Sequence, residues 1–239
     1  MHNAEQFVED IYGPEYYANP ENYPQWDSDI HLSHLLTSRI RAIARLKPQR
    51  GELLDVGTGL GHFMEAARAD GWVVTGVEPS RHARESAKLR SSATVHSRVS
   101  ELLPSARFDC VTLWDVLEHD PDPLHLLTHL GELMRSGALL AVSMPNLGGL
   151  EARLRGSSWR FFRSEFGHMT HHSPNSLSRM LHRVGYEVVS LQTEGSLNLS
   201  GRLHAVLPDA LVESVQSVSD RAVSTLGLGR NMTAYARRR

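Results

Sequence analysis

The chain is poor in cysteine, with only Cys110 among its 239 residues. A single cysteine excludes a disulfide framework and any zinc site built from several thiolates. No hydrophobic run approaches the roughly 20 residues that span a bilayer. The N-terminus has neither the basic nor the hydrophobic segment of a signal peptide. These absences predict a cytoplasmic protein that does not contact membranes.

The chain also lacks an excess of either charge. Its formal net charge is −2 at pH 7, and its lysines and arginines form no block large enough to suggest a nucleic-acid surface. Charged residues make up 22% of the chain and hydrophobic residues 41%, which is ordinary for a globular protein. The composition therefore favours a globular protein without a nucleic-acid partner.

Short apolar segments alternate with helical segments, and hydrophobic residues run through the apolar segments without alternation. This pattern is typical of parallel strands that are buried on both faces of a sheet. The expected strands are 52–56, 72–77, 94–96, 109–114, 138–143, 186–191 and 232–236. A helical pattern between the last two predicts an antiparallel strand. We expect an α/β, Rossmann-like, doubly wound fold: a mostly parallel seven-stranded sheet with an antiparallel edge strand and helices on both faces.

We expect a single domain over residues 1–239, built from four successive parts. An aromatic N-terminal arm or lid (1–30) precedes the core that would bind a cofactor (31–145). Residues 146–172 are rich in glycine, arginine, histidine and aromatic side chains and show little periodicity. Because long loops in compact domains are usually functional, we predict a substrate loop there. Helices and strands that complete the sheet would follow (173–239).

The most specific motif is LLDVGTGLG at 53–61, between the first expected strand and its helix. Ligands of open α/β sheets bind beyond the carboxyl ends of the strands, where glycines let a ligand approach the backbone. A dinucleotide fold would need G-x-G-x-x-G, whereas here the third glycine comes one residue early, at Gly61. Asp55 would repel a pyrophosphate but suits a cation. Glu78 follows the second strand, where an acid can accept hydrogen bonds from the ribose hydroxyls. The motif therefore favours a cationic ligand over a dinucleotide.

This motif and the segment FDCVTLWDVLEH at 108–119 resemble those of the class I S-adenosylmethionine-dependent methyltransferases. The latter segment and residues 173–189 are similar to those of the ubiquinone-biosynthesis-type small-molecule methyltransferases, and the resemblance spans residues 50–190. It implies a methyltransferase whose cofactor is S-adenosyl-L-methionine. The residues that the resemblance assigns to the cofactor are Asp55, Gly57, Gly59, Gly61, Glu78, Pro79, Val99, Ser100 and Trp114.

The resemblance also assigns parts of the cofactor to these positions. The three glycines would line the methionine moiety, Asp55 would support its ammonium group, and Glu78 would hold the ribose hydroxyls. Relatives often carry an acid beside the adenine, whereas this chain has Arg98 and Val99 there. Trp114 corresponds to the position at the end of the fourth strand whose backbone usually meets the methionine end.

Methyl transfer from a sulfonium is an in-line displacement, in which positioning and the exclusion of water provide much of the catalysis. A hydroxyl acceptor needs a base, and the pKa of histidine lies near the operating pH. His119 follows the fourth strand, near the expected methyl group, so we predict that it acts as the general base. We favour oxygen slightly over nitrogen or carbon as the methylated atom. Tyr17, Trp159 and His168 are the candidates for substrate binding.

The residues Asp115, Glu118 and His119 allow a second interpretation of the same segment. One helical turn would bring the three side chains to one face, and some relatives use a divalent ion near a similar segment. Many similar relatives need no metal, and Asp120 followed by Pro121 is typical of a capped helix start. We therefore predict no metal and keep the ion as an alternative.

Two other functions fit parts of the sequence. A methyltransferase-like domain that binds without turnover could use an amphipathic helix expected at 206–226 as a dimer face. A nicotinamide-dependent oxidoreductase conflicts with the early third glycine. The residues after the fifth expected strand lack the signature of methyltransferases that act on nucleobases. We therefore expect a small-molecule methyl acceptor and either a monomer or a homodimer.

Overall fold

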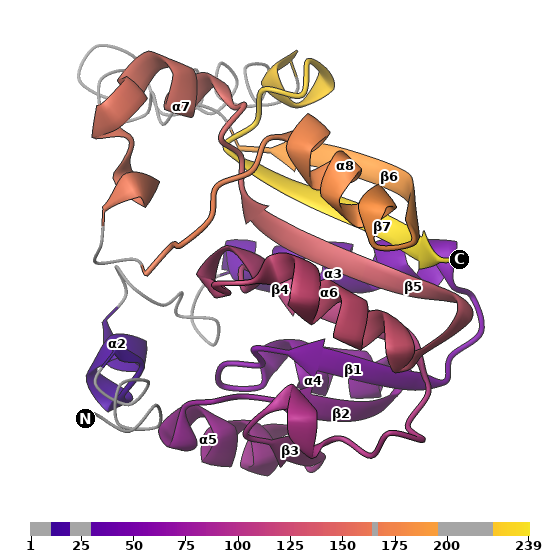
Figure 1. The fold of residues 1–239 in the computed structure, drawn as a ribbon. Coiled ribbons are helices and arrows are strands. Elements are labelled where there is room, and N and C mark those ends of the chain that lie inside the picture. Colours follow the sequence, from indigo (N-terminus) through magenta and orange to yellow (C-terminus); the bar gives the residue numbers. More distant parts are fainter. Residues whose placement is uncertain (1–10, 20–29, 164–166, 196–221) are drawn as a thin grey trace. The chain divides into compact units, whose positions relative to one another are not determined.

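The computed structural model describes residues 11–19, 30–163, 167–195 and 222–239. The strands form a seven-stranded sheet in the order β3-β2-β1-β4-β5-β7-β6, with β7 antiparallel (Figure 1). They are β1 Glu52–Val56, β2 Val73–Val77, β3 Thr94–His96, β4 Phe108–Trp114, β5 Met134–Pro145, β6 Tyr186–Glu194 and β7 Asn231–Arg238. The predicted α/β fold is confirmed, and the antiparallel strand lies next to the edge strand β6.

The helices alternate with these strands in the order that the hydrophobic pattern predicts. The α-helices are α2 Pro14–Ala18, α3 Ile30–Leu46, α4 His62–Ala69, α5 Arg81–Ser91, α6 Pro123–Glu132, α7 Leu150–Arg155 and α8 Pro174–Arg183. Four short 3-10 helices are η1 Val99–Glu101, η2 Leu117–His119, η3 Gly156–Ser158 and η4 Arg160–Phe162. Among the described residues, no helix is both long and apolar enough to cross a bilayer.

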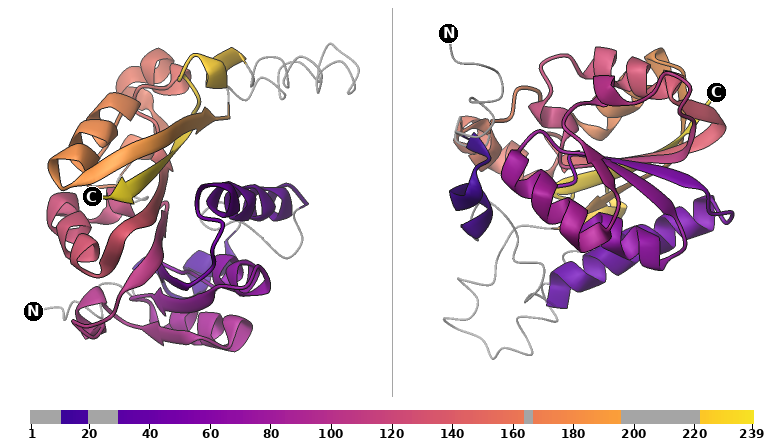
Figure 2. Two further views of the ribbon diagram at one scale, coloured as in Figure 1. Left: turned by 90° about the vertical axis from the view of Figure 1, so that its right-hand side faces the viewer. Right: turned by 90° about the horizontal axis from the view of Figure 1, so that it is seen from below.

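Contacts along the chain group into two compact units. Unit 1 comprises residues 1–114, 129–141 and 237–239, and unit 2 comprises residues 115–128 and 142–236. In unit 1, α4 lies between α3 and α5 and packs on β2, while α5 packs on β3 (Figure 2). In unit 2, α8 packs on β6. The division of the chain into four functional parts stays a prediction.

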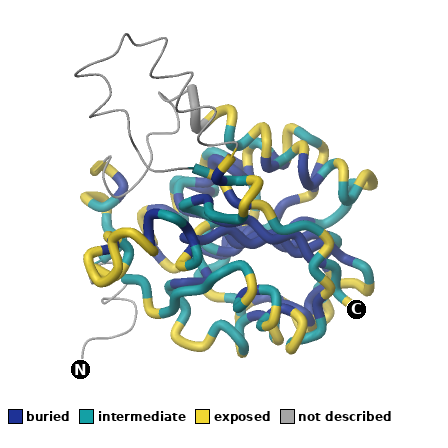
Figure 3. Tube along the Cα trace, turned by 90° about the horizontal axis from the view of Figure 1, so that it is seen from above, coloured by how far each residue is buried: buried dark blue, intermediate teal, exposed yellow. Residues whose placement is uncertain are grey.

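The register of unit 1 aligns the carboxyl ends of β1, β2 and β4. Val56 of β1 pairs with Val77 of β2 and with Leu113 of β4. All three side chains are buried. Figure 3 shows dark blue, buried segments running through the middle of the sheet. The residues that follow these strands therefore emerge at one edge of the sheet, as expected for a ligand site.

The residues after β5 are held in place by a buried side chain of unit 2. Asn146 has no exposed surface; its Nδ2 donates to Gly229 O at 2.8 Å, and its Oδ1 accepts from Gly148 N at 2.8 Å. A Cβ at Gly149 would lie 2.6 Å from Gly229 O, so the two backbones approach too closely for a side chain. This cluster ties the start of the predicted substrate loop to the turn before β7.

The predicted substrate loop contains more regular structure than its sequence suggests. It includes α7, η3 and η4, and a parallel bridge joins Asn146 to His172 near its two ends. After the loop, Ser173 and Ser176 form a capping box that starts α8, with proline at its first position. Most of the amphipathic helix expected at 206–226 lies outside the described residues. In the part that is described, residues 222–225 are helical.

Candidate active site

The turn between β1 and α4 takes a conformation that requires its glycines. Gly57, Gly59 and Gly61 have φ angles of 71°, 53° and 86°, in the left-handed region that favours glycine. Gly57 N donates to Val77 O at 2.7 Å, which fastens the turn to the end of β2. A Cβ at Gly61 would lie 2.7 Å from the Cα of Ala87, so this glycine also lets α4 approach α5 closely. The glycines therefore set the shape of this turn.

Glu78 at the end of β2 faces this turn. Its side chain is buried, and its Oε2 accepts from Gly59 N at 2.8 Å while its Oε1 accepts from Ser80 N at 3.0 Å. The hydroxyl of Ser80 caps α5 by accepting from Ala83 N at 3.3 Å. The Glu78 carboxylate thus links the glycine turn to the start of α5, where it can accept hydrogen bonds from a diol.

Asp55 is a buried carboxylic acid beneath the same turn. Thr112 Oγ1 donates to its Oδ1 at 2.6 Å. Burial raises the pKa of Asp55 to about 7, and the neighbouring Glu78 adds to the increase, while the Thr112 hydrogen bond and the charge of Arg39 oppose it. A substantial part of the Asp55 population is therefore protonated at neutral pH, and a bound cation would favour the ionised form.

Arg39 of α3 is a residue that the sequence reasoning missed. Its side chain is buried, and its guanidinium carbon lies 4.3 Å from the centroid of the Trp114 ring. Phe63 packs against the same indole with its ring centroid at 5.1 Å. A signal was present, because Arg39 is three residues after Leu36 and four before Ile43, on the apolar face of the helix. A buried cation beside Asp55 and Trp114 suits a ligand carboxylate.

The segment predicted to flank adenine forms η1. Val99 is half-buried, and Ser100 and Pro79 are exposed. Glu101 is the acid of this segment, and its Oε2 accepts from Ser97 N at 2.9 Å. The carboxylate thus folds back over the end of β3.

Tyr17 of α2 lies beside the start of α5. It is buried, with its ring centroid 6.0 Å from that of His82. The hydroxyl of Ser80 donates to the carbonyl of Tyr12 at 2.7 Å, which fastens the N-terminal arm to the residue that Glu78 also binds. The structure therefore places Tyr17 close to the residues predicted for the ribose. Tyr23 and Trp26 of the arm lie outside the described residues.

In unit 2, the segment after β4 does not form the helical turn expected for a metal site. Asp115 has a left-handed φ of 57°, and its Oδ1 accepts from Ser143 Oγ at 3.2 Å. The 3-10 helix η2 begins only at Leu117. Asp115 is therefore not on one helical face with Glu118 and His119.

The expected helix start at Asp120 and Pro121 is wrong by two residues. The helix α6 begins at Pro123, and Asp122 is its cap, with Oδ1 accepting from His125 N at 3.1 Å. Asp120 Oδ1 accepts from Asp122 N at 2.7 Å. The Asp-Pro pair occurs twice in succession, and the second pair starts the helix.

His119 is held in a defined orientation by a backbone carbonyl. Its Nδ1 lies 3.3 Å from Gly167 O, and because a carbonyl can only accept, Nδ1 carries the proton and Nε2 is the basic atom. Burial lowers the pKa of His119, and it lowers the pKa of His168 to about 4, with the neighbouring His119 and His171 adding to the latter shift. Both imidazoles are therefore mostly neutral at pH 7.

Glu118 is the most unusual residue of unit 2. It is 2% exposed, and neither of its carboxylate oxygens has a hydrogen-bond partner among the described residues. Burial raises its pKa well above the usual value, and the charge of Asp115 adds to the increase. Glu118, His119 and His168 each offer a ligand atom, and these atoms lie within 4.8 Å of one another. The three residues could therefore hold a metal ion.

Aromatic residues of the predicted substrate loop surround His168. Trp159 is 1% exposed, and its ring packs edge-on against those of Phe161 and Phe162 with centroids 5.2 Å apart. Phe161 in turn stacks on His168 with centroids 5.4 Å apart. The structure thus brings the predicted substrate residues Trp159 and His168 into one cluster.

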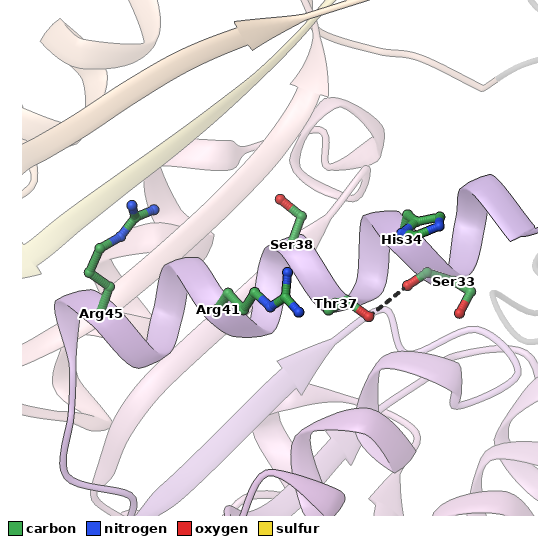
Figure 4. A pocket seen from close by; sticks show the side chains of 6 residues that line it. All are labelled: Ser33, His34, Thr37, Ser38, Arg41 and Arg45. Atoms are coloured by element: carbon green, nitrogen blue, oxygen red, sulfur yellow. Dashed lines mark hydrogen bonds between the residues drawn. The ribbon is translucent and has the colours of Figure 1, made fainter.

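A separate hollow of about 600 Å³ lies along α3. Figure 4 shows the side chains that line it, which are Ser33, His34, Thr37, Ser38, Arg41 and Arg45. They are all exposed, and Thr37 Oγ1 donates to Ser33 O at 3.0 Å. None of the residues predicted for the cofactor is among its described lining.

Comparison with known proteins tests the predicted family. Residues 28–191, more than half of the chain, match the family described as a methyltransferase domain. The chain belongs to the class I S-adenosylmethionine-dependent methyltransferases. Within this methyltransferase, the matched range contains the glycine turn, Glu78 and the histidine cluster of unit 2.

Curated relatives of this methyltransferase include two ubiquinone biosynthesis O-methyltransferases. The one from Haemophilus ducreyi is 32% identical over 107 residues, which cover 40% of this chain and 45% of the relative. The one from Thiobacillus denitrificans is 28% identical over 183 residues, which cover 70% of this chain and 79% of the relative. The match thus spans about half of the former relative's length.

Among solved structures, the methyltransferase is similar to magnesium protoporphyrin IX methyltransferase from Synechocystis with bound S-adenosylhomocysteine. The TM-score is 0.62 at 15% identity, and the match covers 99% of this chain and 100% of the other. At this identity the likeness shows the fold alone.

Proposed function

We propose that this protein transfers the methyl group of S-adenosylmethionine to a small-molecule acceptor. The observation that carries the proposal is the cluster of three buried charged groups around the glycine turn of unit 1. Glu78 suits the ribose hydroxyls, Asp55 suits the ammonium group, and Arg39 suits the carboxylate of the cofactor. These groups complement the ribose and amino-acid ends of the same molecule, whereas a dinucleotide would bring a pyrophosphate to the two acids.

We also propose that His119 acts as the general base for a hydroxyl acceptor. The residue follows Trp114 by five positions in the chain, and its Nδ1 donates to Gly167 O, which leaves Nε2 basic. As the acceptor oxygen attacks the methyl carbon, its proton would pass to Nε2. The sulfur would leave with the bonding electron pair, which forms a methyl ether and S-adenosylhomocysteine.

Oxygen is the acceptor atom that we favour, and the acceptor would contact the aromatic residues of unit 2. The names of both curated relatives specify O-methyl transfer, which supports oxygen here. Phe161 stacks on His168, and the buried Trp159 packs against Phe161, an aromatic arrangement that suits a planar or apolar substrate. His168, held neutral by burial, adds no charge to that surface.

The experiment that tests this function is a metabolite screen with isotope-labelled methyl groups on the cofactor. We expect label to move to a small hydroxylated acceptor, with one S-adenosylhomocysteine formed for each methyl group transferred. Label found only on amines or carbon would overturn the choice of oxygen but not the transfer. Cofactor binding without transfer to any acceptor would favour a methyltransferase-like domain that binds without turnover.

A further inference from the structure

We infer that the exposed face of α3 in unit 1 binds a phosphate group, either as free phosphate or as the monoester of a small molecule. The residues that would hold it are Ser38, Arg41 and Arg45, which line the hollow of about 600 Å³ along this helix. The inference goes beyond methyl transfer and does not rest on it. None of the residues assigned to the cofactor or to the acceptor is among the described lining of the hollow.

The first argument is that α3 carries positive charge without any acid. Its sequence, IHLSHLLTSRIRAIARL, contains three arginines and two histidines but no aspartate or glutamate. Like charges four residues apart on a helix repel one another and destabilise it. Arg41 and Arg45 stand at this spacing on the exposed face, and no acid of the helix offsets their repulsion. An anion bound between them would do so.

The second argument is that these two guanidinium groups have no acidic partner. Neither Arg41 nor Arg45 forms an ion pair or a hydrogen bond with another side chain among the described residues, and both are exposed. Lys47, the next cation along the chain, is different, because its Nζ lies 3.5 Å from Asp109 Oδ1. The two arginines of the hollow are therefore available to an anion from solution.

The third argument is the hydroxyl that accompanies the arginines. Ser38 precedes Arg41 by three positions and Arg45 follows it by four, and residues at these spacings lie about 5–6 Å apart between their Cβ atoms. Figure 4 shows both arginine side chains leaning towards the N-terminal end of α3, the direction that helix geometry favours. Thr37 Oγ1 already donates to Ser33 O at 3.0 Å. The exposed Ser38 hydroxyl has no such bond among the described residues.

The end of the chain adds a further guanidinium beside the C-terminus of α3. Arg237 donates through Nη2 to Leu46 O at 2.9 Å and through Nη1 to Gly137 O at 3.4 Å. Residues 237–239 belong to unit 1, as α3 does. Both acceptors are backbone carbonyls, so these bonds position the charge of Arg237 without neutralising it. The positive potential of the surface next to Arg45 is therefore higher than α3 alone would give.

The donor set indicates phosphate as the anion. Two guanidinium groups and a hydroxyl offer more donors than the two oxygens of a carboxylate can use, whereas phosphate presents three acceptor oxygens and nearly two negative charges. The size of the hollow lies within the range of about 300–1,000 Å³ that is typical of small-molecule sites. The net charge of −2 on the whole chain does not favour an extended polyanion. A phosphorylated small molecule or phosphate itself fits best.

Nuclear magnetic resonance of the full-length protein tests this site with two probes, inorganic phosphate and glucose 6-phosphate, at constant ionic strength. We expect saturable shifts of the Nε–H signals of Arg41 and Arg45, with one ligand bound per chain. Dissociation constants should lie in the millimolar range, because ion pairs on an exposed surface are weak. Both probes should bind. Tighter binding of glucose 6-phosphate would identify a monoester as the ligand, and tighter binding of inorganic phosphate would identify the free ion.

The variants Arg41→Gln and Arg45→Gln should each weaken phosphate binding about fivefold, somewhat less than the loss of a buried charge-assisted hydrogen bond. The control is Arg179→Gln, which removes an exposed arginine of α8 in unit 2 and lowers the net charge equally. It should bind phosphate like the wild type. Melting curves would show that each variant folds.

Shifts that do not saturate would overturn the inference, and so would an equal loss in Arg179→Gln and Arg41→Gln. Either result would show general charge screening by an adventitious ion only. Titration with S-adenosylmethionine in parallel reports the cofactor site of unit 1 separately, so failure of the phosphate site and failure of the proposed methyl transfer are distinguishable.

Discussion

Two buried glutamates, one in each unit, differ in how their carboxylates are satisfied. Glu78 of unit 1 is 5% exposed and accepts hydrogen bonds from the backbone N–H groups of Gly59 and Ser80. Glu118 of unit 2 is 2% exposed and has no partner for either oxygen among the described residues. The comparison indicates that backbone donors satisfy the Glu78 carboxylate, whereas no described group satisfies that of Glu118.

The two units are also expected to differ in which property a substitution changes, cofactor affinity in unit 1 and turnover in unit 2. The groups around the glycine turn are fixed by backbone geometry, so their substitution should weaken cofactor binding. The groups of the histidine cluster are assembled from two distant parts of the chain, so their substitution should alter turnover while leaving cofactor affinity unchanged.

The largest effect is expected at His119. Replacement by glutamine removes the proposed base, and general base catalysis contributes typically about 10²–10⁴-fold in rate. The measurement is kcat for methyl transfer, together with calorimetric affinity for the cofactor, which should not change. His125→Gln, an exposed histidine of α6, is the matched control. A variant that retains full kcat would exclude His119 as the base.

Glu78→Gln should lower the affinity for S-adenosylmethionine by about 100-fold, because hydrogen bonds to a charged group contribute roughly 1.5–3 kcal/mol. The amide also cannot accept from Gly59 N and Ser80 N at the same time. Calorimetry measures the change, and Glu85→Gln on the exposed surface of α5 is the control. An affinity within threefold of the wild type would contradict the role of Glu78 in the ribose contact.

Arg39→Met should lower the affinity for S-adenosylmethionine about tenfold, because the contact with the cofactor's carboxylate is lost. This is the change expected for one charge-assisted hydrogen bond. Methylthioadenosine, which lacks the amino-acid end, should bind the variant and the wild type equally. Arg41→Met, on the exposed side of the same helix, is the control. Equal losses for both ligands would show that Arg39 acts through the packing of Trp114 instead.

Much of the fold and of unit 1 could be predicted from the sequence. The apolar segments predict the strands, and the turn residues are recognisable because left-handed glycines and a strand-end acid have a local signature. The role of Arg39 could not be predicted, because it depends on which residues the apolar face of α3 packs against. The left-handed backbone of Asp115 has no sequence signal, since the residue is not glycine.

The cluster of unit 2 could not be predicted because it depends on tertiary structure. His119 and His168 are 49 residues apart, and no spacing rule connects them. The sequence pattern suggested Asp115, Glu118 and His119 instead, on the assumption of one helical turn. Backbone bonds from residues 169 and 170 to Glu118 bring His168 to the site, and these are visible only in the fold.

The smallest effect concerns the pH dependence set by Asp55. Burial raises the pKa of Asp55 from its ordinary value of 3.8 to about 7. Below pH 3.8 the residue therefore does not oppose folding, and it opposes folding increasingly as the pH rises towards 7. Asp55→Asn should therefore raise the melting temperature more at pH 8 than at pH 4. In the wild type, cofactor binding should release a proton near pH 6.5, and affinity should rise severalfold from pH 6 to pH 8. Calorimetry in buffers of different ionisation enthalpy measures the proton, and a pH-independent affinity would contradict this role.

Calorimetric titration of the wild-type protein with S-adenosylmethionine and, separately, with NAD⁺ is the most direct test of the cofactor assignment. One S-adenosylmethionine should bind per chain, S-adenosylhomocysteine should compete with it, and NAD⁺ should give no saturable heat. Saturable binding of NAD⁺ with none of S-adenosylmethionine would contradict the assignment of Asp55, Glu78 and Arg39 to a cationic nucleoside cofactor.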